Sequence, residues 1–348
     1  MISRMNRPPN WKRLRSGELD WQIFHARARI LKAIRTFFDS RGYLEIEAPL
    51  LTPWPTLDAN ILSVEAAVQT DNRSLPAIFL HTSPEHAMKK LLVSGAEKIY
   101  YLGKVFRNNE LTSRHNPEFT MAEWYRTGAS CADLQKETAD LIRHTAESVF
   151  HILQFEYQGR VLSLAPEWDV RTICALFLDL AGIDLSQALD RDSLYRAALD
   201  ANFPALPGDD WETLFFKIYL QTIEPCLGFP RPVFLTDYPA RMGMMAKRKI
   251  HDPDWVERTE LYIAGLELAN GYTELTDPAE QRDRFLDDLD RKKAAGFSNY
   301  RMDEELLDAM QSGLPPSAGM ALGVDRLVMF FLDRTDIQDV ILFPLHQQ

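Results

Sequence analysis

The stretch from Phe106 to Tyr125, FRNNELTSRHNPEFTMAEWY, brings together arginines, a histidine, carboxylates and aromatic rings. Alternate residues of a strand share one face, so Phe119, Met121, Glu123 and Tyr125 are predicted to lie side by side. A lone glutamate buried between aromatic rings is costly, and Glu123 therefore indicates a cationic partner such as the ammonium of a ligand. The alternative is an ordinary hairpin in which Glu123 faces solvent.

A polar loop separates this strand from the one before it. Arg107 ends the earlier strand, and the loop carries Glu110, Arg114 and His115. The planar fork of arginine matches pairs of phosphate oxygens, and several arginines together suit a polyphosphate. The loop therefore predicts a site for the phosphates of a nucleotide.

A second group of carboxylates follows later in the chain, in LYIAGLELANGYTEL. A hairpin turning at residues 264–265 would put Glu267 opposite Tyr262 and diagonal to Glu260, at roughly 7 to 8 Å. Two carboxylates on one face can hold Mg²⁺ together with substrate phosphates, although two solvated glutamates are the alternative. Glu274 adds a third carboxylate, which requires cations from elsewhere in the fold.

The segment GMALGVDRL predicts a third part of the same site. Gly319 and Gly323 leave space beside the backbone, and Arg326 lies in the first turn of an apolar helix. A helix N-terminus favours anions, and an arginine there adds a full positive charge. A spaced glycine pair alone more often serves packing, and the segment matches neither a P-loop nor a dinucleotide fingerprint.

Composition indicates a globular protein that is long enough to bury a large core. The chain has 348 residues, is 46% hydrophobic and carries a formal charge of −11, which weakens the case for broad nucleic-acid or membrane-surface binding. Basic residues crowd only at the start, at Arg4, Arg7, Lys12, Arg13 and Arg15. We expect residues 1–20 to form a frayed, solvated basic arm, followed by a catalytic domain over 21–348.

Cysteine usage and hydropathy favour the cytoplasm. Cys131, Cys174 and Cys226 are far apart and form no C-x-x-C, so neither a disulfide framework nor a zinc site is expected. No apolar run approaches the ~18 residues that span a bilayer, and the N-terminus lacks the apolar core of a signal peptide.

The hydrophobic pattern mixes helices and strands without regular alternation. Helices are predicted over 21–41, from 82–85 onward, over much of 132–227, over 277–293 and after residue 323. Strands are predicted near 43–53, where Pro49 marks an edge or interface, and over 77–82, 98–107, 119–125, 155–164, 259–275 and 317–323. This order is typical of an α+β fold with an antiparallel sheet flanked by helices.

These segments also resemble a known family. RGYLEIEAPLL, FRNNELTSRHNPEFTMAEWY and ALGVDRL look like motifs 1, 2 and 3 of class II aminoacyl-tRNA synthetases, and HNPEFT with GLELANGYTEL is similar to the lysyl branch. The segments TSPE and ELANG…ELTD are similar to those of truncated lysyl-tRNA synthetase paralogues that modify translation elongation factor P. The resemblance covers almost the whole chain and implies ATP, Mg²⁺ and a homodimer with Pro49 at its interface.

The resemblance implies a two-step ligation, in which ATP activates an amino acid as an adenylate and a lysine side chain then accepts it. Arg107 and Arg326 would be catalytic, and Glu260 and Glu267 would hold Mg²⁺. The implied ATP contacts are Arg107 at the α-phosphate, Phe119 on adenine, and Asn108, Asn109, Glu110, His115, Asn116, Glu267, Leu268, Gly323 and Arg326. Glu85 and Glu274 with Tyr125 would bind the two amines of a lysine-like substrate, helped by Ser83, Pro84, Glu123, Asn270 and Ala321.

Two positions depart from the family pattern. Asn109 stands where motif 2 normally has glutamate, with Glu110 following, so adenine recognition uses either an amide or a shifted loop. Ala321 stands where lysyl-tRNA synthetases have glycine in motif 3. A methyl group there could disfavour α-lysine and suit (R)-β-lysine, whose amine lies one carbon further along.

Three functions remain open at this point. The leading interpretation is a ligase that transfers (R)-β-lysine or lysine to a lysine of elongation factor P. Lysyl-tRNA synthetases carry an OB-fold anticodon-binding domain before motif 1, whereas the motif 1 helix here begins near Trp21, so we expect tRNA not to be a partner. The alternatives are a free-standing lysyl ligase acting on tRNA or a small molecule, and a catalytically silent regulator.

Overall fold

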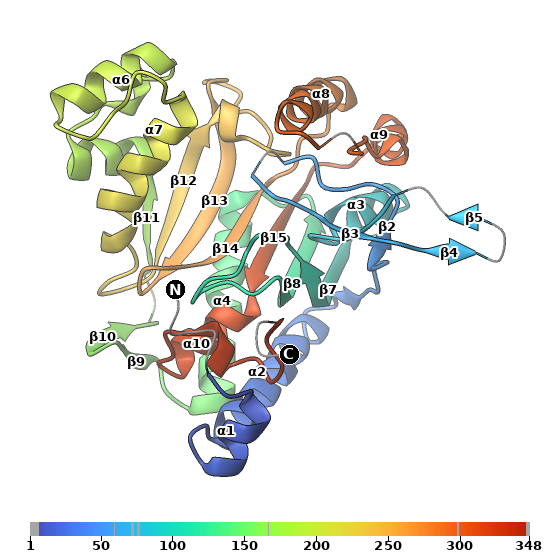
Figure 1. Cartoon of the computed structure of the whole chain (residues 1–348), viewed down its shortest axis with the longest axis vertical. Helices are drawn as coiled ribbons and strands as arrows, with labels where there is room; N and C mark the ends of the chain where they lie inside the picture. Colours follow the sequence, from blue (N-terminus) through green and yellow to red (C-terminus); the bar gives the residue numbers. More distant parts are fainter. Residues whose placement is uncertain are drawn as a thin grey trace.

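An eight-stranded sheet forms the centre of the molecule (Figure 1). The computed structural model describes residues 7–58, 60–70, 73–74, 77–165, 167–297 and 299–345. In spatial order the strands are β1 (Leu44–Glu45), β7 (Lys98–Phe106), β8 (Glu118–Thr127), β15 (Ser317–Gly323), β14 (Leu266–Thr273), β13 (Trp255–Ile263), β12 (Val233–Pro239) and β11 (Asp169–Thr172). Neighbours are antiparallel except for the outermost pairs, β1 with β7 and β11 with β12. The predicted α+β class is confirmed.

One face of the sheet is covered by α2 (Trp21–Asp39), α4 (Cys131–Phe150) and α10 (Val324–Phe331). Asp20 caps α2 by accepting a hydrogen bond from the Gln22 N–H at 2.9 Å. The apolar residues of α2 recur at helical spacing and are buried: Ile23, Ile30, Ile34, Phe37 and Phe38. Phe38 stacks on Tyr100 of β7 with ring centroids 4.6 Å apart, which fixes the helix to the sheet.

The opposite face carries α3 (Glu85–Val93), α8 (Pro278–Ala294) and α9 (Glu304–Gln311), with α8 and α9 packed together (Figure 1). The predicted passage from strand to helix is confirmed, because β6 (Ile78–Leu80) leads into α3. The Ser83 hydroxyl accepts a hydrogen bond from the Glu85 N–H at 3.0 Å, as a capping side chain does. Short strands beside this face are β2 (Leu51–Thr52), β3 (Val64–Ala66), β4 (Gln69–Thr70) and β5 (Arg73–Ser74).

The region between motifs 2 and 3 is mostly helical, as predicted, and lies at the β11 and β12 end of the sheet (Figure 1). After α4 come the hairpin β9 (Gln154–Tyr157) and β10 (Arg160–Ser163), then α5 (Ile173–Leu176), η1 (Phe177–Ala181), η2 (Leu185–Gln187), α6 (Arg191–Asp200), α7 (Trp211–Ile218), η3 (Tyr219–Ile223) and η4 (Glu224–Cys226). The remaining short helices are η5 (Ala240–Met242) and η6 (Ile337–Asp339). Strand β11 was not predicted, because D-V-R-T lacks apolar alternation and half of the strand is exposed.

The described part of the basic arm is not frayed, which corrects the sequence-based expectation. Helix α1 (Asn10–Ser16) packs against the end of the chain, and Arg13 is only 5% exposed. Its guanidinium pairs with Asp339 and Glu18, each at 2.8 Å. Glu18 is close in sequence, but Asp339 lies at the far end of the chain, so a local pattern could not reveal that partner. Arg4 lies outside the described residues.

Two further expectations concern the environment of the chain. Cys131, Cys174 and Cys226 are all free, as expected for a chain without a disulfide framework. Within the described residues, no helix is both long and apolar enough to cross a lipid bilayer. The fold therefore depends on its two packed cores, one on each face of the sheet.

Candidate active site

A cavity of about 650 Å³ opens on the sheet face beneath α3 and α8 and contains most of the predicted site residues. The predicted residues that line it are Ser83, Glu85, Arg107, Glu110, His115, Asn116, Phe119, Glu123, Tyr125, Glu260, Glu267, Leu268, Asn270, Ala321, Gly323 and Arg326. Four predicted residues are not among those lining it in the described structure: Pro84, Asn108, Asn109 and Glu274. Segments far apart in the sequence thus meet at one cavity.

Strand β8 supplies the floor of the cavity with the predicted alternation. Phe119, Met121, Glu123 and Tyr125 all line the cavity, whereas Trp124 is fully buried on the other face. Gly319 of the neighbouring strand is needed for this arrangement, because a Cβ there would lie 2.2 Å from the Tyr125 ring. The glycine of motif 3 therefore makes room for the tyrosine.

Arginines gather around His115 at one end of the cavity. The Arg326 Nη1 donates to the Glu267 carbonyl at 2.7 Å, and its Nη2 contacts His115 Nε2. Burial, and after it the positive charge of Arg326, lowers the pKa of His115 to about 4, so the ring is neutral. A neutral ring that accepts from Arg326 at Nε2 carries its proton on Nδ1, which lies 2.8 Å from the Thr112 hydroxyl.

Arg107 completes this basic end. Its guanidinium carbon lies 5.3 Å from the centre of the Phe119 ring, and among the described residues its buried Nε has no hydrogen-bond partner. Glu110 is its nearest acid, with Nη1 to Oε1 at 3.8 Å. An arginine with an unused buried donor is suited to an anionic ligand.

The loop after Arg107 answers the question raised by Asn109. Asn109 has φ 65° and is exposed, a left-handed conformation that asparagine tolerates, and its N–H is bound by Asn108 Oδ1 at 2.9 Å. Glu110, one residue later, lines the cavity. The geometry therefore favours the shifted-loop alternative over an amide at position 109.

The Asn116 side chain is used within the fold. Its Nδ2 donates to the Glu118 carbonyl at 2.6 Å, and its Oδ1 accepts from the Leu345 N–H at 3.2 Å. The amide has two N–H groups and its oxygen two lone pairs, so these bonds fix the side chain while one N–H and one lone pair of this cavity-lining residue stay unused by them. Sequence spacing could not reveal this, because Leu345 lies at the far end of the chain.

The predicted hairpin of carboxylates is confirmed. Its turn contains Ala264 with φ 56° and Gly265 with φ 71°, and Glu267 pairs with Tyr262 across the strands. Glu260 pairs with Asn270, and a bulge follows before Tyr262. Glu260 and Glu267 accordingly share the face that lines the cavity.

Glu260 is held by partners that the sequence analysis did not identify. Arg258 lies 2.6 Å from its Oε1, and the hydroxyls of Tyr238 and Tyr262 donate to Oε2 at 2.5 and 3.1 Å. Burial raises the pKa of Glu260, Arg258 opposes this and Glu267 adds to it. Arg258, Glu260 and Tyr262 alternate along one strand, so strand periodicity could have revealed this cluster.

The carboxylate pair fits the role of a partial metal site. The described residues include no group of three or more His, Cys, Asp or Glu side chains placed to hold a metal ion. Mg²⁺ commonly takes one or two carboxylates and completes its shell with phosphates and water. Glu267, with 39% of its side chain exposed, and the repulsion that it exerts on Glu260 suit that partial role.

Glutamates gather at the other end of the cavity. Glu123 is only 2% exposed, which overturns the solvent-facing alternative, and burial raises its pKa to about 8. It accepts hydrogen bonds from the Ser83 hydroxyl at 2.8 Å and the Tyr125 hydroxyl at 2.9 Å. Among the described residues no ion pair joins Glu123 to a lysine or arginine, although the more distant Arg107 acts to lower its pKa, and a cationic ligand stays the predicted partner.

The cation that the carboxylates require is Lys89, which the sequence analysis missed. Its side chain is fully buried, and its Nζ lies 2.8 Å from Glu85 Oε1 and 2.6 Å from Glu274 Oε2. Glu274 is thus reached through Lys89, which corrects the expectation that it faces the substrate directly. The spacing of Glu85 and Lys89, four residues apart on one helix, could have revealed the pair.

Ala321 lies between the two polar neighbours expected to contact the substrate. In β15 it pairs with Glu123 of β8 on one side and with Asn270 of β14 on the other. It lines the cavity, so its methyl group is part of the wall. The position predicted to influence substrate shape is therefore within the glutamate end.

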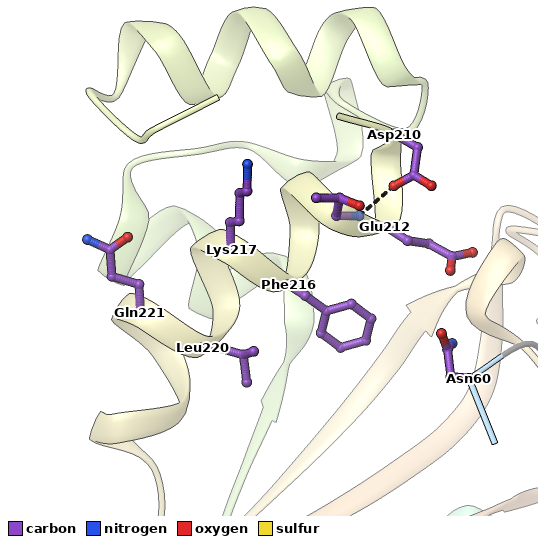
Figure 2. Close-up of a pocket in the computed structure, with 8 residues that line it drawn as sticks. Asn60, Asp210, Glu212, Phe216, Lys217, Leu220 and Gln221 are labelled. Carbon is purple, nitrogen blue, oxygen red and sulfur yellow. Dashed lines mark hydrogen bonds between the residues drawn. The ribbon is translucent and has the colours of Figure 1, made fainter. Parts of the chain in front are cut away.

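The helical region forms part of the cavity mouth. A second hollow of about 670 Å³ lies beside α7 and η3 (Figure 2). Asn60, Glu212, Phe216 and Leu220 line both this hollow and the main cavity. Asp210 caps α7 by accepting from the Thr213 N–H at 2.8 Å, which holds this wall in place (Figure 2).

An antiparallel sheet with arginines from motifs 2 and 3 at one end of its cavity defines a class II synthetase fold. Residues 10–347 match the family of tRNA synthetases class II (D, K and N), and the chain belongs to that family.

Within this family the similarity is to lysine-specific members. The chain is 34% identical over 97% of its length to the Lysine--tRNA ligase of Pelotomaculum thermopropionicum and covers 69% of it. It is 36% identical to the Lysine--tRNA ligases of Carboxydothermus hydrogenoformans and Moorella thermoacetica, with 93% of the chain and 65% of each relative covered. The chain thus spans about two thirds of the length of these relatives.

Proposed function

We propose that the protein is an ATP-dependent ligase that activates (R)-β-lysine, or lysine, as an adenylate and transfers it to a lysine side chain of translation elongation factor P. The observation that carries this proposal is the division of one cavity into an arginine end and a buried glutamate end. A nucleotide and a diamino acid, which have opposite charges, would meet between them.

The proposed first step joins the amino-acid carboxylate to the α-phosphorus of ATP and releases pyrophosphate. Arg107 would neutralise the α-phosphate, using the donor that lacks a partner in the fold. Arg326 and the neutral His115 would bind the far side of the nucleotide, and Phe119 would stack on adenine. Glu110 would take the adenine contact that motif 2 normally assigns one residue earlier.

Glu260 and Glu267 would hold Mg²⁺ against the phosphates, and the bound ion would offset phosphate charge. Arg258 and the two tyrosine hydroxyls keep Glu260 oriented for that purpose. The cavity floor, with Ser83, Glu123 and Tyr125, would bind ammonium groups of the substrate. In the second step a lysine amine attacks the acyl carbon, AMP leaves with the anhydride bond electrons, and the amine loses a proton.

The formal charge of −11 supports a protein acceptor, because it disfavours a polyanion. The methyl group of Ala321 in the cavity wall supports (R)-β-lysine as the activated amino acid. Leu44, Leu50 and Leu51 around Pro49 are 64%, 43% and 48% exposed, which supports a homodimer through this segment. The free cysteines are consistent with the proposed cytoplasmic location.

A second candidate is a lysyl ligase acting on tRNA or a small molecule, favoured by the names of the similar proteins. Amino-acid-dependent exchange of pyrophosphate into ATP tests activation with (R)-β-lysine, α-lysine and no amino acid. Transfer of labelled amino acid to elongation factor P supports the proposal, and transfer to tRNA supports the second candidate. The lack of exchange with any amino acid would instead favour the silent regulator.

A further inference from the structure

Lys89 is the fully buried ammonium in the glutamate end of the cavity. Its Nζ contacts Glu85 Oε1 at 2.8 Å and Glu274 Oε2 at 2.6 Å, and it lies 5.6 Å from the centre of the Tyr272 ring. Met245 Sδ lies 3.6 Å away on another side. A lysine enclosed in this way stays charged only because both carboxylates face it, and together they raise its pKa against the effect of burial.

The three acidic residues differ in their access to the cavity. Glu85 and Glu123 line it, whereas Glu274 is not among the lining residues of the described structure. Lys89 Nζ lies 2.6 Å from Glu274 Oε2, and its charge and hydrogen bond oppose the effect of burial on the pKa of Glu274. The order from the cavity inward is therefore Glu85, Lys89 and Glu274.

This arrangement sets the net charge of the glutamate end of the cavity. Burial raises the pKa of Glu123 and Glu274 to about 8 in the ligand-free fold, and a bound ammonium favours their ionised form. Once Glu85, Glu123 and Glu274 are all ionised, the single ammonium of Lys89 leaves two negative charges for the substrate to neutralise. A diamino acid activated as an adenylate carries two ammonium groups and no longer carries a free carboxylate. Its two positive charges match the two that remain in the pocket, whereas an amino acid with one amine would leave one buried charge uncompensated.

We propose that Lys89 is a positioning residue whose permanent ammonium reduces the three-glutamate cluster to the charge that a diamino acid neutralises, while holding Glu85 toward the cavity. The proposal rests on the proposed activation of lysine or (R)-β-lysine. Lys89 acts through Glu85 and touches no reacting atom. The Tyr272 hydroxyl donates to Glu85 Oε1 at 2.6 Å and fixes the same carboxylate from the second side.

Several charged or titratable groups face this cluster and enter its titration: Glu85, His86 and Lys89 from α3, Glu123 and Tyr125 from β8, Tyr272 from β14, Glu274 after it, and Arg107 toward Glu123. The pKa of Glu85 is lowered, because Lys89 outweighs the opposing effect of burial. Burial raises the pKa of Glu274 to about 8 although Lys89 opposes it. Removal of Lys89 would thus raise the pKa of both carboxyls.

The test compares Lys89→Met with Lys90→Met in the full chain. Lys90 lies on the same helix but pairs with Asp303 and Glu305 of α9, outside the cavity. In pyrophosphate exchange, K89M should raise the KM for the diamino acid about tenfold or more and leave the KM for ATP within about twofold. K90M should leave both constants within about twofold of the parent.

The double variant K89M/E274Q separates charge from packing. It removes one cation and one anion, so the cluster again has two uncompensated negative charges. Most of the affinity for the diamino acid that K89M loses should therefore return. A buried ion pair can often be replaced without loss when both partners go together. An unchanged KM in K89M, or a double variant no better than K89M, would overturn the proposal.

A second measurement does not depend on activity. The thermal midpoint of K89M should fall relative to K90M as pH rises from 5 to 8, because carboxyls with raised pKa values resist ionisation in the fold. A difference that is constant over this range would overturn the charge role of Lys89. If the parent shows no pyrophosphate exchange with any of the amino acids tested, the proposed function fails. The thermal unfolding series still decides the role of Lys89 in that case.

Discussion

The two ends of the cavity are built from opposite charges and held by different means. At the arginine end, Arg107 and Arg326 are partly exposed, and Arg326 is fixed mainly by backbone carbonyls and a neutral histidine. At the glutamate end, Glu85, Glu123 and Glu274 are packed with hydroxyls and one buried lysine. The cavity therefore presents a partly exposed basic surface at one end and a largely buried acidic surface at the other.

The difference has an energetic consequence. A partly exposed arginine needs little compensation before the ligand arrives, since water solvates it. A buried glutamate is stable only if it is protonated, accepts hydrogen bonds from hydroxyl groups or pairs with a buried cation. Glu123 has a raised pKa and hydroxyl partners, while Glu85 and Glu274 have Lys89. The glutamate end is therefore the end expected to respond to pH.

The largest effect is expected at the arginine end, from Arg107→Ala. Loss of a positive charge at the α-phosphate should lower kcat/KM for pyrophosphate exchange roughly 100- to 1,000-fold. Arg282→Ala is the matched control, because Arg282 pairs with Glu304 on the surface. Near-parent exchange by R107A would mean that another group neutralises the α-phosphate.

Glu123→Gln tests the glutamate end. The substitution keeps hydrogen-bonding atoms but removes the charge, so the KM for the amino acid should rise about 10- to 100-fold, as roughly 1.5–3 kcal/mol is typical for a hydrogen bond to a charged group. The KM for ATP should change little, which distinguishes the two ends. An equal rise in both constants would contradict the division of the cavity.

The same variant gives a pH test. The folded pKa of Glu123 is about 8, above its ordinary 4.5, so the carboxylate forms as pH rises toward 8. In the parent, affinity for the ammonium should improve over pH 6 to 9, and ionisation should lower the stability of the ligand-free fold over pH 5 to 8. E123Q should flatten both trends, as measured by KM and by thermal unfolding at each pH.

Glu110→Gln examines the arginine end more finely. If Glu110 contacts adenine, the loss of its charge should raise the KM for ATP about tenfold and leave that for the amino acid unchanged. Asn109→Gly is the control, since glycine tolerates the left-handed conformation of that residue. A larger effect from N109G than from E110Q would contradict the shifted loop.

Much of the division of the cavity into an arginine end and a glutamate end could be predicted from the sequence, because it depends on local patterns. The alternation from Phe119 to Tyr125 predicted which side chains of β8 face the cavity. The turn at Ala264 and Gly265 predicted that Glu260 and Glu267 share one face. Strand and helix periodicities need only neighbouring residues. The resemblance to class II synthetases then supplied roles that geometry alone does not provide.

The remaining features depend on contacts between distant segments. The Asn116 side chain, expected to contact the nucleotide, is fixed by the Leu345 N–H and by a carbonyl of its own loop. Arg13 was expected in solvent, but Asp339 pairs with it. Lys89 was overlooked because a lysine in an amphipathic helix usually faces water, and only the packed fold shows it between Glu85 and Glu274.

The smallest effect, and the finest test of the glutamate end, is expected from Ala321→Gly. The alanine methyl group lies in register between Glu123 and Asn270, so its removal widens the wall on which the substrate backbone would rest. The ratio of kcat/KM for (R)-β-lysine over α-lysine should fall by about tenfold or less, since one methyl group contributes roughly 1 kcal/mol of discrimination.

Ala318→Gly is the matched control for that change, because Ala318 lies on the same strand and is not among the residues lining the cavity. Any general weakening of β15 by glycine should appear in both variants, whereas a change in the isomer ratio should appear only in A321G. An unchanged ratio in A321G would mean that substrate shape is set elsewhere, and that charge rather than the wall at Ala321 governs which lysine isomer is activated.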